Sequence, residues 1–147
     1  LADVGLEAAG VPASVWAATS HVVFPYFAAC ELADWPQGGP PDDLLRLGAQ
    51  GMREVASLHG WTGYAISWTL WPPLVRTIMA AQRKQCGKPG TPLDFDDFGK
   101  AHHGIKVGEQ NVKVMREYVA ALTAAGGPHE ALDELVRRVE KKRGANM

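Results

Sequence analysis

The sequence has few cysteines, no excess of positive charge and no glycine-rich phosphate loop. Its two cysteines, Cys30 and Cys86, have neither CxxC nor CxxxC spacing, which excludes a disulfide framework and favours a reduced, cytoplasmic protein. The formal net charge is −1, so no basic face marks a nucleic-acid partner. Neither GxGxxG nor a P-loop motif occurs, so the chain has no phosphate-binding loop of its own.

Long apolar runs and metal-binding motifs are also missing. The uncharged run at residues 14–30 is interrupted by polar residues and Pro25, so no membrane span or membrane partner is expected. HExxH is absent, and the adjacent His102 and His103 would point about 100° apart on a helix, so we predict no metal site. GxSxG and SxxK are absent too, and the sequence assigns no catalytic residue.

Apolar residues do recur at helical spacing, and no segment alternates apolar and polar residues over the length of a strand. At 147 residues, 46% of them apolar, the chain is long enough to bury the core of one domain. We therefore predict a single all-α domain, residues 1–147, with six to seven helices. The main ones are expected at residues 14–33, 42–59, 74–85, 94–125 and 129–142.

The longest predicted helix, residues 94–125, is expected to be the central helix. Asp94 is its predicted N-cap, and its small and apolar residues alternate in steps of three and four. A second, thinner apolar line on the opposite side indicates neighbours on both sides, either other helices or a second copy in a homodimer. This line consists of Val107, Val114, Tyr118 and Ala121. The main stripe consists of Phe98, Ala101, Ile105, Gly108, Val112, Met115, Val119 and Leu122.

A polar seam borders this stripe at His102, Lys106 and Glu109, which share one face of the predicted helix. A histidine, a cation and a carboxylate together could bind an anionic substrate or transfer a proton near neutral pH. The same spacing also fits a salt-bridged, solvated edge. Ser20 and His21 form a second polar pair on the helix at residues 14–33, where a histidine is more often a hydrogen-bonded core residue.

The five tryptophans are many for this length, and four aromatic residues crowd one short segment: Trp61, Tyr64, Trp68 and Trp71. Such a cluster lines a ligand pocket, covers a partner surface, or simply covers a small helical core. It supports one interpretation of the chain as a non-catalytic helical module, used for dimerisation or for binding a small apolar ligand.

Two stretches resemble ketopantoate reductase-like proteins, the 2-dehydropantoate 2-reductase family. LLRLGAQGMREVASLHGW, residues 44–61, is similar to a family helix that carries a glutamate and ends in glycine, matched here by Glu54 and Gly60. HHGIKVGEQNVKVMREYVAALTAAGGPHEALDELVRR, residues 102–138, resembles the long helix, Gly-Pro turn and closing helix of the family's C-terminal domain. That domain belongs to the 6-phosphogluconate dehydrogenase C-terminal-like fold.

The resemblance implies a function as well as a fold. In that family an N-terminal Rossmann domain carries NADP, and a C-terminal helical domain closes the cleft over a small-molecule substrate. This chain would be the substrate-side domain of an NAD(P)-dependent oxidoreductase, partnered by an N-terminal nucleotide-binding domain and holding no cofactor alone. The family's catalytic lysine has no counterpart on the helix at residues 14–33, so the substrate is not implied. The residues expected to face the cleft are Ser20, His21, His102, Lys106 and Glu109.

Overall fold

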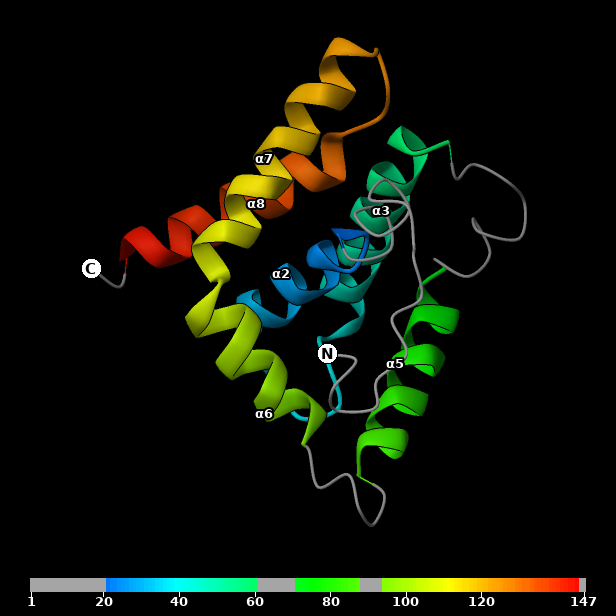
Figure 1. Cartoon of the computed structure of the whole chain (residues 1–147), viewed down its shortest axis with the longest axis vertical. Coiled ribbons are helices and arrows are strands. Elements are labelled where there is room, and N and C mark those ends of the chain that lie inside the picture. The colour runs from blue at the N-terminus through cyan, green and yellow to red at the C-terminus, as the bar shows by residue number, and fades with distance from the viewer. Residues whose placement is uncertain (1–20, 61–70, 88–93, 146–147) are drawn as a thin grey trace, which may run out of the picture.

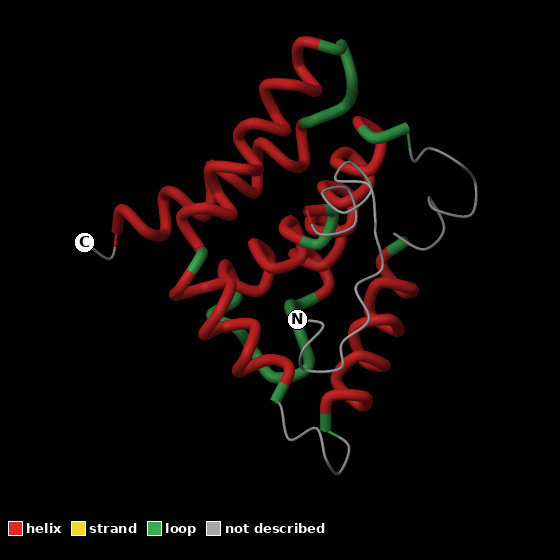
Figure 2. The backbone as a smooth tube through the Cα atoms, viewed as in Figure 1, coloured by secondary structure: helices red, strands yellow, loops and turns green. Residues whose placement is uncertain are grey.

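The computed structural model describes residues 21–60, 71–87 and 94–145, and every regular element in these ranges is a helix (Figure 1). The prediction of an all-α fold is confirmed for this part of the chain, along which the backbone has no strand (Figure 2). The elements are α2 (Phe24–Leu32), α3 (Asp42–Leu58), α5 (Pro72–Cys86), α6 (Phe95–Gly99), the π-helix η2 (Lys100–Lys106), α7 (Gly108–Ala124) and α8 (Glu130–Ala145).

The core lies around α2, the short helix in the middle of Figure 1, against which α3, α7 and α8 pack. Its residues from Pro25 to Cys30 are all buried. One cluster of buried side chains joins α2 and α3 to α7 and α8, and a second joins α2 and α3 to α5. Among the described helices, none combines the length and hydrophobicity that crossing a membrane requires.

The helix predicted at residues 14–33 differs from the structure at Pro25. The chain turns at Val22 and Val23, and α2 begins at Phe24 with Pro25 in its first turn. A proline there breaks no helical hydrogen bond, so it starts the helix rather than kinking it. The part of the prediction before His21 lies outside the described residues.

Two glycines allow α3 to approach α2 closely at this proline. A Cβ at Gly48 would lie 3.1 Å from the Pro25 carbonyl oxygen, and one at Gly51 would lie 3.0 Å from Pro25 Cβ. The crossing of the two helices therefore depends on the absence of side chains at these positions.

The segment predicted as one long helix, residues 94–125, forms three elements instead. Asp94 caps α6 as predicted, since its carboxylate accepts hydrogen bonds from the backbone N–H groups of Asp96 and Asp97 at 2.9 Å. The π-helix η2 follows, and a bend at Val107 (φ −120°, ψ 14°) separates it from α7. The first half of the segment and α7 are therefore not one continuous α-helix.

The break divides the predicted apolar stripe in two. Val112, Met115 and Leu122 on α7 are buried as predicted. Before the break, Phe98 is 44% exposed and Ile105 is 78% exposed. A π-helix closes i→i+5 hydrogen bonds and so adds about one residue to a turn, which shifts the stripe's register.

α5 is held to the rest of the domain by an ion pair between Arg83 and Asp96. Arg83 donates from Nε and Nη2 to the carboxylate at 2.7–2.9 Å, and from Nη2 to the buried Tyr26 hydroxyl at 2.9 Å. Burial alone would raise the pKa of Asp96, but the Arg83 guanidinium and the Gly38 N–H lower it below its usual range. The ion pair joins the C-terminal end of α5 to α6 and α2.

Candidate functional site

A hydroxyl group held between two histidines forms the most distinctive polar cluster of the described residues. The Tyr118 hydroxyl, on α7, lies 2.9 Å from Nδ1 of His21 and 3.1 Å from Nε2 of His59. Both imidazoles meet the Tyr118 ring edge-on, at centroid distances of 5.8 and 5.6 Å. We refer to His21, His59 and Tyr118 as the His–Tyr–His cluster.

Three different segments bring these side chains together. His59 is the C-cap of α3, where Gly60 ends the helix in the left-handed region at φ 71°. Tyr118 lies one turn after the buried Met115, so the packing of α7 points its ring inward. His21 precedes α2 and contacts the Phe24 ring at a centroid distance of 4.9 Å. The cluster therefore joins the end of α3, the start of α2 and the middle of α7.

Burial favours the neutral forms of Tyr118 and His21. It raises the pKa of the Tyr118 hydroxyl. It also lowers the pKa of His21, and the nearby His59 imidazole lowers that pKa further. A neutral phenol beside a neutral imidazole is a pair that can pass a proton in either direction.

A pocket of 300 Å³ opens beside the cluster, at the lower limit of volumes typical of small-ligand sites. Of the described residues that line it, Tyr118 and His21 form the polar wall, and Glu117 is the only charged one. None of these described residues is a cation, so they suit a small, largely apolar molecule with one polar group at the Tyr118 hydroxyl. The remaining lining residues are Leu58, Val114 and Ala121.

A row of rings continues from this cluster along α2. Phe24 lies between His21 and His103, and the His103 ring stacks on Phe27 at 3.9 Å and 15°. Burial, together with the neighbouring His102, lowers the pKa of His103 to about 4. The Asn111 amide donates to the His103 carbonyl oxygen at 3.2 Å. A neutral, stacked imidazole of this kind packs η2 against α2.

The residues predicted to face a cleft are only partly brought together. His21 lines the pocket, whereas Ser20 lies outside the described residues. His102 stacks on Phe98 at a centroid distance of 5.4 Å, away from that pocket's lining. Lys106 is exposed at the end of η2. Glu109 is exposed on α7, where it lines a different groove with Lys113 and Arg116.

The predicted seam therefore does not share one α-helical face. His102 and Lys106 both lie on the π-helix, where residues four apart are not aligned as on an α-helix, and the bend at Val107 separates Lys106 from Glu109. Their roles in substrate binding stay a prediction. Of the aromatic cluster, Trp61, Tyr64 and Trp68 also lie outside the described residues.

Sequence reasoning assigned neither His59 nor Tyr118 to a site. Tyr118 was expected among the apolar residues of the thinner line on the predicted long helix. An apolar role does not use its hydroxyl group, and that group was the signal that could have indicated a site. His59 was expected only as a helix end, where a histidine also suits the negative end of the helix dipole. No sequence motif links either residue to His21, because the hydrogen-bonded partners lie far apart in the sequence. His21 and Tyr118 are 97 residues apart, and His59 and Tyr118 are 59 residues apart.

Glu54 matches the glutamate of the similar helix in ketopantoate reductase-like proteins, and in this structure it stabilises the fold. Its side chain is 2% exposed, and its carboxylate accepts the N–H groups of Ala131 at 3.1 Å and Leu132 at 2.8 Å. These donors belong to the first turn of α8, whose positive dipole end favours an anion. Glu54 is thus the cap of α8, supplied by α3.

Within the described ranges, no group of three or more His, Cys, Asp or Glu side chains is placed to hold a metal ion. The Cys30 thiol is buried, which raises its pKa to about 12 and keeps it protonated. The His–Tyr–His cluster is therefore the candidate site for proton chemistry. Comparison of the chain with protein-family models, with curated proteins and with solved structures gave no match.

Proposed function

We propose that the chain is the substrate-side helical domain of an NAD(P)-dependent oxidoreductase similar to the ketopantoate reductases, and that Tyr118 donates the proton in carbonyl reduction. The observation that carries the proposal is the Tyr118 hydroxyl at the wall of a small pocket, hydrogen-bonded to His21 and His59.

Carbonyl reduction adds a hydride to carbon and a proton to oxygen, which converts the C=O bond to a C–H and an O–H bond. The nicotinamide of NADPH, bound by an N-terminal nucleotide-binding domain, would supply the hydride. The Tyr118 hydroxyl gives its proton to the alkoxide that forms, and this transfer is favourable because an alkoxide is more basic than a phenolate even when burial raises the phenol pKa. An imidazole of the cluster then returns a proton to the phenolate from one ring nitrogen while its other ring nitrogen takes a proton from water, so the ring stays neutral.

The composition of the pocket supports substrate binding on this chain and nucleotide binding on the N-terminal domain. The described part of its lining holds one carboxylate and no cation, which does not fit the phosphates of a dinucleotide. A neutral ketone or aldehyde with a small apolar group fits Leu58, Val114 and Ala121 better. The nucleotide is therefore expected on the partner domain, and only the carbonyl end of the substrate is expected here.

The second candidate function is that of a non-catalytic module for dimerisation or for a small apolar ligand. It rests on a different observation, the exposure of Phe98 and Ile105 along α6 and η2. Large apolar side chains exposed together favour a partner surface.

The test is NADPH-dependent reduction of a panel of ketones and aldehydes by the full-length product of the gene. Tyr118→Phe should lower kcat by about 100-fold or more, with a small change in KM, because it removes only the proton donor. His59→Gln should lower kcat less. His129→Gln is the matched control, since His129 bonds to the Gly127 carbonyl outside the cluster, and it should retain full turnover.

Two results would contradict the oxidoreductase proposal. One is an upstream reading frame without a strand followed by a glycine-rich nucleotide loop. The other is a Tyr118→Phe variant, folded by circular dichroism, that keeps the turnover of the unmodified protein. Self-association that Ile105→Asp abolishes, in a protein without turnover, would favour the module instead.

A further inference from the structure

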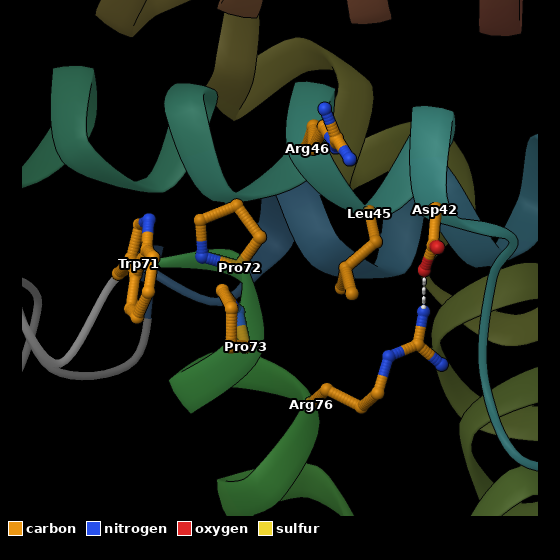
Figure 3. Close-up of a pocket in the computed structure, with 7 residues that line it drawn as sticks. All are labelled: Asp42, Leu45, Arg46, Trp71, Pro72, Pro73 and Arg76. Carbon is orange, nitrogen blue, oxygen red and sulfur yellow. Dashed lines mark hydrogen bonds and ion pairs between the residues drawn. The ribbon is translucent and has the colours of Figure 1, made fainter.

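A second and larger pocket lies between the first turns of α3 and α5 (Figure 3). Its volume is 540 Å³, within the range of small-ligand sites. Trp71 lies at one end, and the ion pair of Asp42 with Arg76 lies at the other. Arg46 projects from α3 above Leu45, and the rings of Pro72 and Pro73 form the opposite wall.

The pocket is distant from the His–Tyr–His cluster. Both pockets have residues of α3 in their lining, Leu45 in this one and Leu58 in the other. The positions are thirteen residues apart, which corresponds to roughly 20 Å along a helix. A ligand here would therefore not touch Tyr118, and the two sites are independent.

The charges of the two pockets differ in sign. Among the described lining residues, Arg46 and Arg76 supply two positive charges and Asp42 one negative charge, a net charge of +1, whereas those of the Tyr118 pocket supply one negative charge, from Glu117. Arg76 uses one N–H for Asp42 and keeps other donors of its planar guanidinium. Arg46 is exposed and makes no ion pair within the described ranges. Both guanidiniums can therefore donate to a carboxylate.

The apolar part of the pocket is flat. Trp71 is 46% exposed, so part of its indole is open to a ligand, and the two proline rings continue the surface beside it. Leu45, which is 3% exposed, closes the base. An aromatic ring in this space would stack on an indole and cover proline carbons, which is favourable apolar burial.

We propose that this pocket is a binding site for a small aromatic monocarboxylate. The carboxylate pairs with Arg46 and Arg76, and the ring lies on Trp71, Pro72 and Pro73. One carboxylate neutralises the +1 charge of these described lining residues, whereas a phosphate dianion would leave an excess negative charge beside Asp42. The site does not depend on the proposed oxidoreductase function.

The experiment is calorimetric titration of the 147-residue chain at low salt with naphthoate, and with the neutral naphthalenemethanol as the uncharged probe. Naphthoate should bind saturably, and the neutral probe at least about tenfold more weakly. Arg46→Gln and Trp71→Leu should each raise the naphthoate Kd by about tenfold, because one removes a charged donor and the other the stacking surface. Added salt should weaken binding.

Arg138→Gln is the matched control, since it removes the same charge from the exposed side of α8, remote from this pocket's lining. Its naphthoate Kd should be unchanged. Circular dichroism of each variant verifies the fold. Equal binding of the two probes, no saturation by naphthoate, or equal loss in Arg46→Gln and Arg138→Gln would overturn the proposal.

Discussion

At the scale of single residues, the buried polar side chains divide into those that complete the fold and those that face a pocket. Glu54 and Asn111 are the buried polar residues of the described chain, at 2% and 6% exposure, and both bond to backbone groups of a neighbouring element. Tyr118 is nearly as buried, but its hydroxyl bonds to imidazoles at a pocket wall. Burial alone therefore does not separate a structural polar group from a candidate functional one.

Replacing Glu54 by alanine should lower the free energy of unfolding by about 2–4 kcal/mol, because two buried N–H groups of α8 lose their acceptor. Glu54→Gln should cost less, since the amide keeps one acceptor oxygen. Denaturant unfolding measures both. Glu134→Ala is the control: it breaks surface ion pairs on the same helix and should cost below about 1 kcal/mol.

His103 should make the protein less stable in mild acid. Burial lowers the pKa of the folded-state imidazole from 6.5 to about 4, so below pH 6.5 the unfolded chain binds a proton that the folded one does not. Stability should then fall between pH 6.5 and about 4 and level off below. Allowing for solvent screening, the loss is about 1–2 kcal/mol.

Thermal unfolding across this pH range tests the expectation. His103→Phe keeps a flat ring against Phe27 and removes the titrating group, so its stability should depend less on pH. If both proteins lose stability in parallel, another group is responsible.

At the scale of elements, the break in the predicted long helix is the feature of the fold that the sequence pattern did not predict. The predicted helix at residues 42–59 corresponds to α3, with His59 as its C-cap, because Pro41, Asp42 and Gly60 mark its ends. Residues 94–125 have an equally regular pattern, yet η2 changes the register inside it. Phe98 was expected to be the buried residue of this turn, but Gly99 is buried instead. A three-four pattern assumes an unbroken α-helix, so it does not reveal a π-helix.

The reason for the register change lies in a distant residue. Trp35 has a positive φ of 55° and packs its indole on the backbone of Gly99 and Gly104. These glycines accommodate a ring from a loop about 65 residues earlier in the chain, a long-range contact that periodicity does not encode. For the same reason the His–Tyr–His cluster was not predictable, while His21 alone was named as a candidate.

Gly104→Ala should destabilise the protein by about 1–3 kcal/mol through crowding. The new Cβ would lie 2.9 Å from Nε1 of Trp35, so the indole or η2 must move. Helix propensity alone predicts the opposite sign, because alanine is favoured over glycine by about 1 kcal/mol. Gly144→Ala on α8 is the matched control, since a Cβ there has no atom within 4 Å, and it should be neutral or slightly stabilising in denaturant unfolding.

At the scale of the whole molecule, α8 closes the fold by returning to α2. Lys142 donates to the carbonyl oxygens of Glu31 at 2.7 Å and Leu32 at 3.1 Å, in the last turn of α2, where helical carbonyl groups lack intrahelical partners. Arg143 pairs with the Glu31 carboxylate through two hydrogen bonds of 2.6 and 2.7 Å. The basic residues near the end of the sequence therefore hold together helices more than 100 residues apart.

Lys142→Met combined with Arg143→Met should lower the free energy of unfolding by about 1–3 kcal/mol, because both the carbonyl acceptors and the Glu31 carboxylate lose charged donors. Lys141→Met removes a cation at an exposed position of the same helix and should change stability by less than about 0.5 kcal/mol. If urea unfolding shows that the double change and Lys141→Met lower the free energy of unfolding equally, then net charge, and not the contact with α2, determines the stability.

The Tyr118 hydroxyl carries one hydrogen but has two imidazole neighbours. One histidine must accept that hydrogen while the other donates its own to the hydroxyl oxygen. Since His21 bonds through Nδ1 and His59 through Nε2, the two neutral rings take the same tautomer: both are protonated on Nε2 when His21 accepts, and both on Nδ1 when His59 accepts. The cluster is therefore polarised, with two arrangements related by reversal of every hydrogen bond. Nitrogen chemical shifts of the two rings should show one nitrogen protonated toward Tyr118 and one bare.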